Sequence, residues 1–174
     1  MTLSTARIDV STALFGLPCA CGSLRRATRV VTRIYDEALR PSGLEIMQFG
    51  LMASLDRLGE GTQRQLSVGF AMDSTTLTRT LGLLQRRGWI ERKPAKDKRQ
   101  RILRLTKQGR ARLEKARPLW RKAQEDLYAL IGKDAFETLT RVSHDIVAVL
   151  HPDRSVASGF SRTSEGPPKG GPHV

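Results

Sequence analysis

Small hydroxyl side chains and one arginine gather at the start of a helix that the sequence predicts over residues 74–87. Asp73 is a good N-cap for this helix, and Gly88 suits its C-terminal end. Hydroxyl groups at a helix N-terminus can approach phosphates and base edges, and an arginine can reach a guanine edge with a bidentate fork. The helix therefore has the chemistry needed to read DNA. The predicted contact residues are Ser74, Thr75, Thr76, Thr78 and Arg79.

One face of the same helix is apolar. Leu77, Leu81 and Leu84 are spaced by four and three residues, so we expect them to pack in the core. That rotation leaves the polar side chains on the other faces. For Ser74 and Thr75 the alternative interpretation is helix capping alone, and for the arginine it is an ion pair on the protein's own surface.

A basic loop follows this helix between two predicted strands. Residues 89–93 and 101–105 have strand character, and positive charges dominate residues 94–100 between them. A helix followed by a β-ribbon with a basic tip is typical of a winged helix-turn-helix, in which the helix enters the major groove and the tip reaches the adjacent minor groove. The alternative is an exposed basic hairpin without a partner, although charges this dense repel one another without a polyanion.

The positive charge of the chain is concentrated around this element. Of a net charge of +13, residues 79–122 contribute +14, from 17 Lys/Arg against 3 Asp/Glu, and all other residues sum to −1. A focused basic patch marks a polyanion site more often than a uniformly basic surface does. For residues 107–122 a solvated helix face explains the charges equally well.

Composition and the cysteines argue against several other classes. A chain of 174 residues, 39% of them hydrophobic, holds one domain, or one domain and a tail. Cys19 and Cys21 point apart and do not bridge easily, which indicates a reducing cytoplasm. The histidines lie far from them in sequence, so we expect no metal and no cofactor. No apolar run reaches the roughly 18 residues of a membrane span, and the N-terminus is unlike a signal peptide.

Periodicity predicts a mainly α fold with a small β-wing. Pro118 lies inside a long predicted helix and should kink it, or lie where the broken hydrogen bond meets solvent. Gly132 separates this helix from the last one. Helices are predicted over residues 21–38, 46–55, 62–68, 74–87, 106–131 and 136–150. We assign residues 1–17 to an N-terminal arm, residues 18–151 to the folded domain and residues 152–174 to a disordered tail rich in Pro, Gly and Ser.

The wing carries a motif that resembles the MarR family of bacterial transcription regulators. Asp97-Lys98-Arg99 and, five residues later, Leu105-Thr106-Lys107-Gln108-Gly109 match that family's Asp-x-Arg and Leu-Thr-x-x-Gly pattern. The segment 40–49 looks like the family's junction between its first helices, and 84–90 looks like its passage from the recognition helix into the wing. The resemblance runs from about Pro18 to Leu150.

This resemblance implies a winged helix-turn-helix flanked by N- and C-terminal dimerisation helices. The DNA-binding core would cover about 45–109, and the dimerisation helices about 18–40 and 106–151. Arg99 would insert into the minor groove, where a strong negative potential attracts arginine. Asp97 would hold the wing loop through a basic neighbour. Phosphate contacts are implied for Lys96, Lys98 and Arg101.

The resemblance also implies an obligate homodimer in which the first and last helices intertwine. The apolar stripes of these helices agree, because they exceed what the DNA-binding core alone could cover. In this family, a cleft between the dimerisation and DNA-binding parts takes small, often aromatic or phenolic, ligands. The candidate lining residues are Arg26, Tyr35, Met47, Phe49 and Met52, although periodicity alone places residues 47–55 in the core.

The cysteines offer a second regulatory hypothesis. Among MarR relatives, organic-hydroperoxide sensors carry a reactive cysteine near the start of the first helix, 14 residues before a tyrosine, and Cys21 and Tyr35 have that spacing. A helix N-terminus favours the nucleophilic thiolate. The sensors have a second tyrosine where this chain has Ile46, which weakens the likeness. The alternative is that Cys19 and Cys21 are small buried hydrophobes.

The sequence therefore predicts a cytoplasmic, homodimeric, DNA-binding regulator, a repressor that a small effector releases from a pseudo-palindromic operator. A peroxide-sensing repressor acting through Cys21 is one alternative. The other is an architectural protein that binds any duplex with a steep salt dependence. We do not expect an enzyme, because no Ser/His/Asp constellation, phosphate loop or metal cluster stands out in the sequence.

Overall fold

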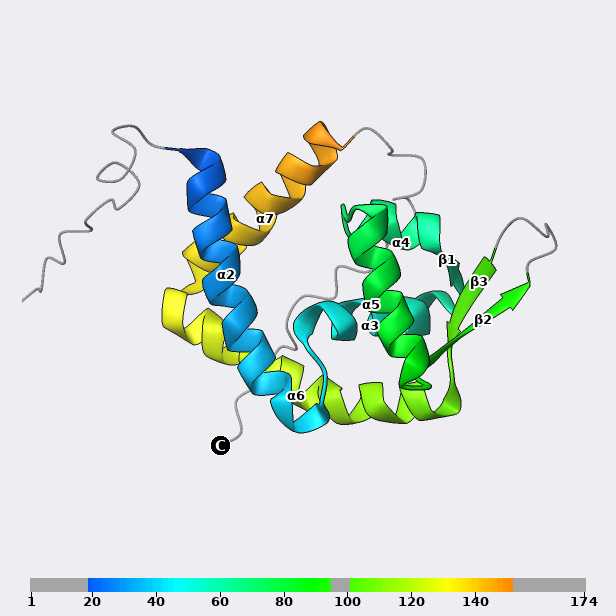
Figure 1. Ribbon diagram of the computed structural model, residues 1–174. Coiled ribbons are helices and arrows are strands. Elements are labelled where there is room, and N and C mark those ends of the chain that lie inside the picture. The colour runs from blue at the N-terminus through cyan, green and yellow to red at the C-terminus, as the bar shows by residue number, and fades with distance from the viewer. Residues whose placement is uncertain (1–18, 95–100, 152–174) are drawn as a thin grey trace, which may run out of the picture.

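The computed structural model describes residues 19–94 and 101–151 (Figure 1). The predicted N-terminal arm and tail lie outside the described residues, as does the tip of the wing. The elements in chain order are α2 (Ala20–Leu39), the 3-10 turn η1 (Arg40–Ser42), α3 (Ile46–Leu58), β1 (Gly61–Thr62), α4 (Gln63–Gly69), α5 (Ser74–Arg86), β2 (Ile90–Pro94), β3 (Arg101–Leu105), α6 (Lys107–Ile131) and α7 (Lys133–Leu150).

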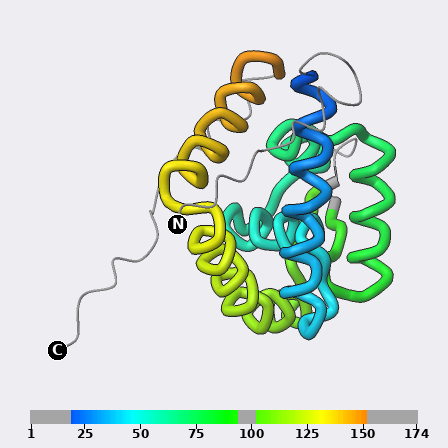
Figure 2. The backbone as a smooth tube through the Cα atoms, turned by 90° about the vertical axis from the view of Figure 1, so that its left-hand side faces the viewer, coloured from blue at the N-terminus to red at the C-terminus, as the bar shows by residue number. Residues whose placement is uncertain are grey.

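The molecule has a compact lobe and three long helical arms. The lobe contains α3, α4, α5 and the small sheet, while α6 runs from the sheet beneath the lobe to α2 (Figure 1). In the view of Figure 2, α2 and α7 stand as separate helices, and α7 continues upward from the region where α6 ends. The fold is mainly helical with a small β-wing, as the sequence predicts. Within residues 19–94 and 101–151, no helix is both long and apolar enough to cross a membrane.

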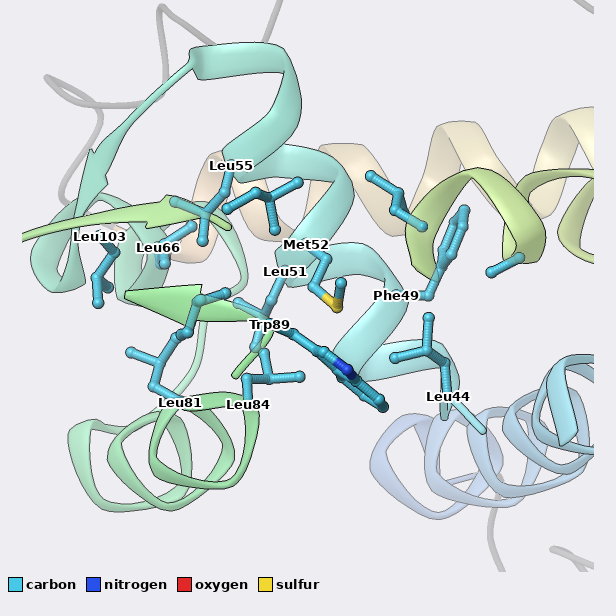
Figure 3. Packing of buried hydrophobic residues seen from close by; sticks show 14 of the residues in the cluster. Leu44, Phe49, Leu51, Met52, Leu55, Leu66, Leu81, Leu84, Trp89 and Leu103 are labelled. Atoms are coloured by element: carbon cyan, nitrogen blue, oxygen red, sulfur yellow. The ribbon is translucent and has the colours of Figure 1, made fainter. Parts of the chain in front are cut away.

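Apolar side chains from α3, α4, α5, β2 and β3, most of them leucines, meet in one core (Figure 3). The leucines predicted to face inward from the DNA-reading helix, Leu77, Leu81 and Leu84, have no exposed surface. A smaller cluster of Tyr35, Ala123 and Leu127 joins α2 to α6. The core thus fixes the rotation of α5, and the smaller cluster fixes the position of the arms.

The sheet has three antiparallel strands in the order β1-β3-β2. Ile90 pairs with Leu105 at the base of the wing, and Gly61 pairs with Leu103 on the other side of β3. The two wing strands are predicted by their sequence. β1 is not, because two residues are too short to show a period of two.

Side-chain hydrogen bonds cap the N-termini of most of the helices. Asp73 accepts the Thr76 amide hydrogen at 2.8 Å, which confirms its predicted capping role. Thr62 and Gln65 form a reciprocal capping box at α4. α3 has no cap from its own N-cap residue, and Asp36, ten residues earlier on α2, accepts the Ile46 amide hydrogen at 2.7 Å instead.

Apolar side chains at the ends of the long arms are exposed to solvent. Pro118 is exposed within α6, so its missing hydrogen bond lies at solvent, one of the two outcomes expected. Leu130, predicted to lie on the apolar stripe of α6, is 75% exposed. No residue of α7 is buried within the single chain. Among residues 19–94 and 101–151 of one copy, no side chain covers these apolar groups.

Candidate nucleic-acid interface

α5 lies on the outside of the lobe, with its leucine face toward the core and its polar face toward solvent (Figures 1 and 2). All the side chains predicted to contact DNA from this helix are exposed: Ser74, Thr75, Thr76, Thr78 and Arg79. An exposed helix face of this length, with small side chains at its start, can enter a major groove.

Hydrogen bonds within the chain distinguish the hydroxyl groups on this face. The Thr78 hydroxyl donates to the Ser74 carbonyl at 2.6 Å and accepts from Gln63 Nε2 at 2.7 Å. Capping is done by Asp73 rather than by Ser74 or Thr75. Arg79 is exposed and forms no ion pair among the described residues. The side chains of Ser74, Thr75 and Arg79 are thus available to contact another molecule.

Asp73 holds the first turn of α5. Hydrogen bonds to its carboxylate, above all from the Thr76 backbone, lower the pKa of Asp73 below its ordinary value of 3.8. Because the folded pKa is depressed, the cap stabilises the fold fully above that ordinary value, and its contribution is lost as the pH falls through the lowered pKa.

We expect Asp73→Asn to reveal this titration, because asparagine caps a helix as well as aspartate but does not ionise. The variant and the natural protein should unfold at nearly equal urea concentrations at pH 6. Below about pH 4 the natural protein should lose stability relative to the variant. Urea midpoints at several pH values measure the difference, and a difference that stays constant with pH would contradict the capping role.

The wing projects away from the lobe as the ribbon β2–β3 (Figure 1). Across the ribbon, Arg104 Nε donates to the Glu91 carboxylate, and this bond lowers the pKa of Glu91. Lys93 Nζ lies 4.0 Å from the same carboxylate. Arg101 begins β3, while the predicted tip contacts Lys96, Lys98 and Arg99, together with Asp97, lie outside the described residues.

The Leu-Thr-x-x-Gly segment joins the base of the wing to α6. Leu105 is buried, and the Thr106 hydroxyl donates to the Gly88 carbonyl at 2.6 Å while accepting from the Gly109 amide at 3.0 Å. The Thr106 amide donates to the Trp89 carbonyl at 3.0 Å. A Cβ on Gly109 would overlap that carbonyl oxygen. The motif is therefore a joint, in which threonine caps and bridges while glycine allows the backbones to touch.

Comparison with known proteins decides the family. The sequence model of the MarR family matches residues 42–100. The multiple antibiotic resistance protein MarR of Escherichia coli is 31% identical over 120 residues, which are 68% of this chain and 76% of that protein. This chain belongs to the MarR family. The uncharacterised HTH-type transcriptional regulator YwoH of Bacillus subtilis is 29% identical over 122 residues, 68% of this chain and 89% of that protein.

Solved structures of MarR-type regulators share the fold. The Mycobacterium tuberculosis regulator MosR, in complex with DNA, superimposes with a TM-score of 0.69 at 35% identity, covering 76% of this chain and 96% of that one. A mutant of E. coli MarR bound to operator DNA gives a TM-score of 0.68 at 25% identity, over 79% of this chain and 98% of that one. The chain is thus a DNA-binding transcription regulator of the MarR type, and the family is one of regulators rather than enzymes.

A cleft of about 840 Å³ lies where the lobe meets α6 and α2. Two of the residues predicted to line a ligand cleft, Met47 and Phe49, do line it. Met52 has no exposed surface and belongs to the core, Tyr35 packs in the smaller cluster, and Arg26 is not part of the lining. The apolar pattern of residues 47–55 predicted core packing for all three α3 residues, and tertiary contacts leave Met47 and Phe49 at the cleft.

Sequence reasoning missed the α6 side of this cleft. Trp120 stacks on Phe49 with ring centroids 5.6 Å apart, and Arg117 and Arg121 line the same wall. Asp56, also in the lining, binds Arg110 at 2.6 Å and Arg117 at 2.7 Å. These residues lie far from α3 in sequence, so no local pattern could bring them together.

Both cysteines are exposed free thiols at the start of α2. The sulfur of Cys19 accepts the Gly22 amide hydrogen at 3.4 Å and caps the helix, which places Cys19 rather than Cys21 at the N-terminus. Along a helix that rises 1.5 Å per residue, Cys21 and Tyr35 are about 21 Å apart. The Tyr35 hydroxyl instead donates to Gln124, and burial raises its pKa. The two predicted redox partners therefore do not meet within one chain.

Proposed function

We propose that this MarR-family regulator is a homodimeric repressor that binds a pseudo-palindromic operator in the cytoplasm and leaves it when a small ligand occupies the cleft. The observation that carries the proposal is the exposed polar face of α5 beside the wing, in a fold shared with regulators solved on DNA. A two-fold dimer would place one α5 in each of two successive major grooves.

Fluorescence anisotropy on duplex DNA from upstream of the protein's own gene tests this function. With excess competitor DNA present, a specific regulator keeps a high affinity for its operator. An architectural protein would bind all duplexes equally, with a steep salt dependence and no specific component. Loss of all binding in competitor would overturn the operator proposal and favour the architectural alternative.

We expect Arg99→Ala to lower operator affinity at least several-fold, because a wing-tip arginine would lose its place in the negative potential of the minor groove. The slope of log affinity against log salt should fall by about one. Lys122→Ala is the matched control, since Lys122 is 74% exposed and bound to Asp126 on α6. Equal affinity for Arg99→Ala and the natural protein at moderate salt would contradict the wing assignment.

Exposed apolar side chains support the proposed dimer. Apart from Met47 of α3, those of the described residues lie on the arms: Leu24, Val30, Leu130, Ile131, Val142, Val147, Val149 and Leu150. An apolar helix face of this extent is usually covered by another protein surface. Because α7 buries no residue in one chain, a second copy is the proposed cover.

The cleft lining supports a small aromatic effector that carries a negative charge. The Phe49–Trp120 stack offers flat apolar surfaces, and Arg121 offers a cation beside it, while Arg117 is paired with Asp56. Benzoate is a suitable first probe. We expect it to lower operator affinity in the natural protein and to have less effect in Arg121→Met. An equal effect in both proteins would place the ligand elsewhere.

The exposure of both thiols supports oxidation as a second candidate signal. The same anisotropy titration can be run reduced and then after a mild organic hydroperoxide. Operator release that a thiol reductant reverses, and that Cys21→Ser abolishes, would favour a redox sensor. Binding that survives oxidation would leave the cleft as the site of regulation.

A further inference from the structure

Two arginines from different elements make cation–π contacts with one tryptophan at the junction between the arms and the DNA-binding lobe. Arg87 ends α5, and its guanidinium carbon lies 4.9 Å from the centroid of the Trp89 ring. Arg112, in the second turn of α6, places its own guanidinium carbon 5.2 Å from the same centroid. Trp89 is 6% exposed, Arg112 is half-buried and Arg87 is exposed, so the two guanidinium groups cover the ring from the solvent side. Figure 3 shows Trp89 reaching toward Leu44.

The same guanidinium groups also donate hydrogen bonds to the turn that follows α2. Arg87 Nη1 donates to the Gly43 carbonyl at 3.0 Å, and Arg112 Nη1 donates to the Ser42 carbonyl at 2.9 Å. This turn, η1 and Gly43, connects α2 to α3, and Gly43 adopts the left-handed conformation with φ +70°. We call Arg87, Trp89, Arg112 and these two carbonyls the Trp89 clamp. It ties the end of α5, the start of the wing and α6 to the end of α2.

Buried polar groups reinforce the clamp. Ser42 and Gln48 are each 3% exposed, and with Ser54 they are the buried polar residues of the described chain. The Ser42 hydroxyl donates to the Leu39 carbonyl at 2.6 Å, and Gln48 Nε2 donates to Glu45 at 3.0 Å. Gln48 Oε1 lies 3.5 Å from Arg87 Nη1. All hydrogen bonds of such a network form together only in one conformation of the turn. The network therefore specifies the geometry of the turn more than an apolar contact would.

We propose that the Trp89 clamp is a positioning device that fixes the orientation of α5 relative to the arms, and thereby the half-site spacing that the dimer accepts. This inference rests on the proposed operator-binding dimer. In such a dimer the arms would set the two-fold axis, while α5 reads the groove. A change of two base pairs in the spacing rotates one half-site by roughly 70° about the DNA axis. A dimer with a rigid clamp binds the altered spacing weakly. A dimer with a loosened clamp binds it less weakly, because α5 can partly reorient.

The test uses Arg112→Met, which removes the cation and the bond to Ser42 but keeps the length of an apolar side chain. An operator is first selected from a pool of random duplexes with the natural protein. Anisotropy then gives affinities for that operator, for versions with the spacing changed by two base pairs, and for a single half-site. Lys115→Met, which removes one positive charge from an exposed position of α6 outside the clamp, is the matched control.

We expect the natural protein and Lys115→Met to prefer the selected spacing equally. In Arg112→Met this preference should fall at least about threefold, while half-site affinity stays within about twofold, because only the connection between the lobe and the arms has loosened. An unchanged spacing preference, or an equal loss on half-site and operator, would overturn the clamp. If Arg112→Met does not fold, Trp89→Phe is judged by the same ratio. A natural protein that enriches no sequence would contradict the proposed function itself.

Discussion

Gly109→Ala is expected to lower the free energy of unfolding by about 3 kcal/mol or more, the upper range for forcing an extra methyl group into a packed site. The added Cβ would overlap the carbonyl oxygen of Trp89 and lie 2.8 Å from its carbonyl carbon. These atoms belong to the backbone, so no side chain can move aside. Relief would require α6 to shift away from the wing.

That shift would also break the bonds of the wing joint. The Thr106 amide donates to the same Trp89 carbonyl at 3.0 Å, and the Gly109 amide donates to the Thr106 hydroxyl at 3.0 Å. Buried donors and acceptors that lose their partners add to the cost. Operator affinity should therefore fall together with stability, because Trp89 lies between α5 and the wing.

Gly82→Ala provides a matched control with the opposite sign. Gly82 lies inside α5, and a Cβ there would meet only Arg86 Nη1, at an ordinary 3.5 Å. Alanine should stabilise the helix by roughly 0.5–1 kcal/mol, since glycine loses more conformational freedom on folding. Urea unfolding measures both changes. Equal stability of Gly109→Ala and the natural protein would mean that α6 does not approach the wing this closely.

Local signals predicted most of the elements correctly. Asp73 and Gly88 delimit α5 in the sequence because capping needs only nearby backbone groups, and the structure confirms both roles, with Gly88 at φ +69°. β1 was missed because its two residues become a strand only by pairing with β3, some 40 residues further on. The cap of α3 was missed for a similar reason, since Asp36 comes from another helix.

For the candidate sites too, local patterns predicted what depends on nearby residues and missed what depends on residues far away in the sequence. The polar face of α5 follows from the spacing of its leucines, because a helix that buries one face must expose the other. The cleft does not follow, because Trp120 and Arg117 face Phe49 only after α6 has folded back across α3. Met47 and Met52 belong to the same apolar run of α3, and the packing buries Met52 completely and leaves Met47 38% exposed.

The double substitution Val147→Asp and Leu150→Asp should separate the proposed dimer into monomers and lower operator affinity at least about a hundredfold, because two half-sites bound by linked lobes gain a high effective concentration. Val147 is 45% exposed and Leu150 is 74% exposed in one chain. New carboxylates there meet water in the monomer and would meet apolar surface in the dimer. The fold of each chain should therefore survive.

Thr138→Asp controls for the added charge on the same helix. Nine residues separate Thr138 from Val147, which is 2.5 helical turns, so the two positions lie on opposite faces of α7. Sedimentation equilibrium gives the oligomeric state, and anisotropy on operator and half-site gives the affinities. The double variant should bind a half-site nearly as well as one lobe of the natural protein does. A double variant that stays dimeric would place the dimer interface away from the C-terminal end of α7, and an affinity loss shared by Thr138→Asp would assign the effect to charge rather than to assembly.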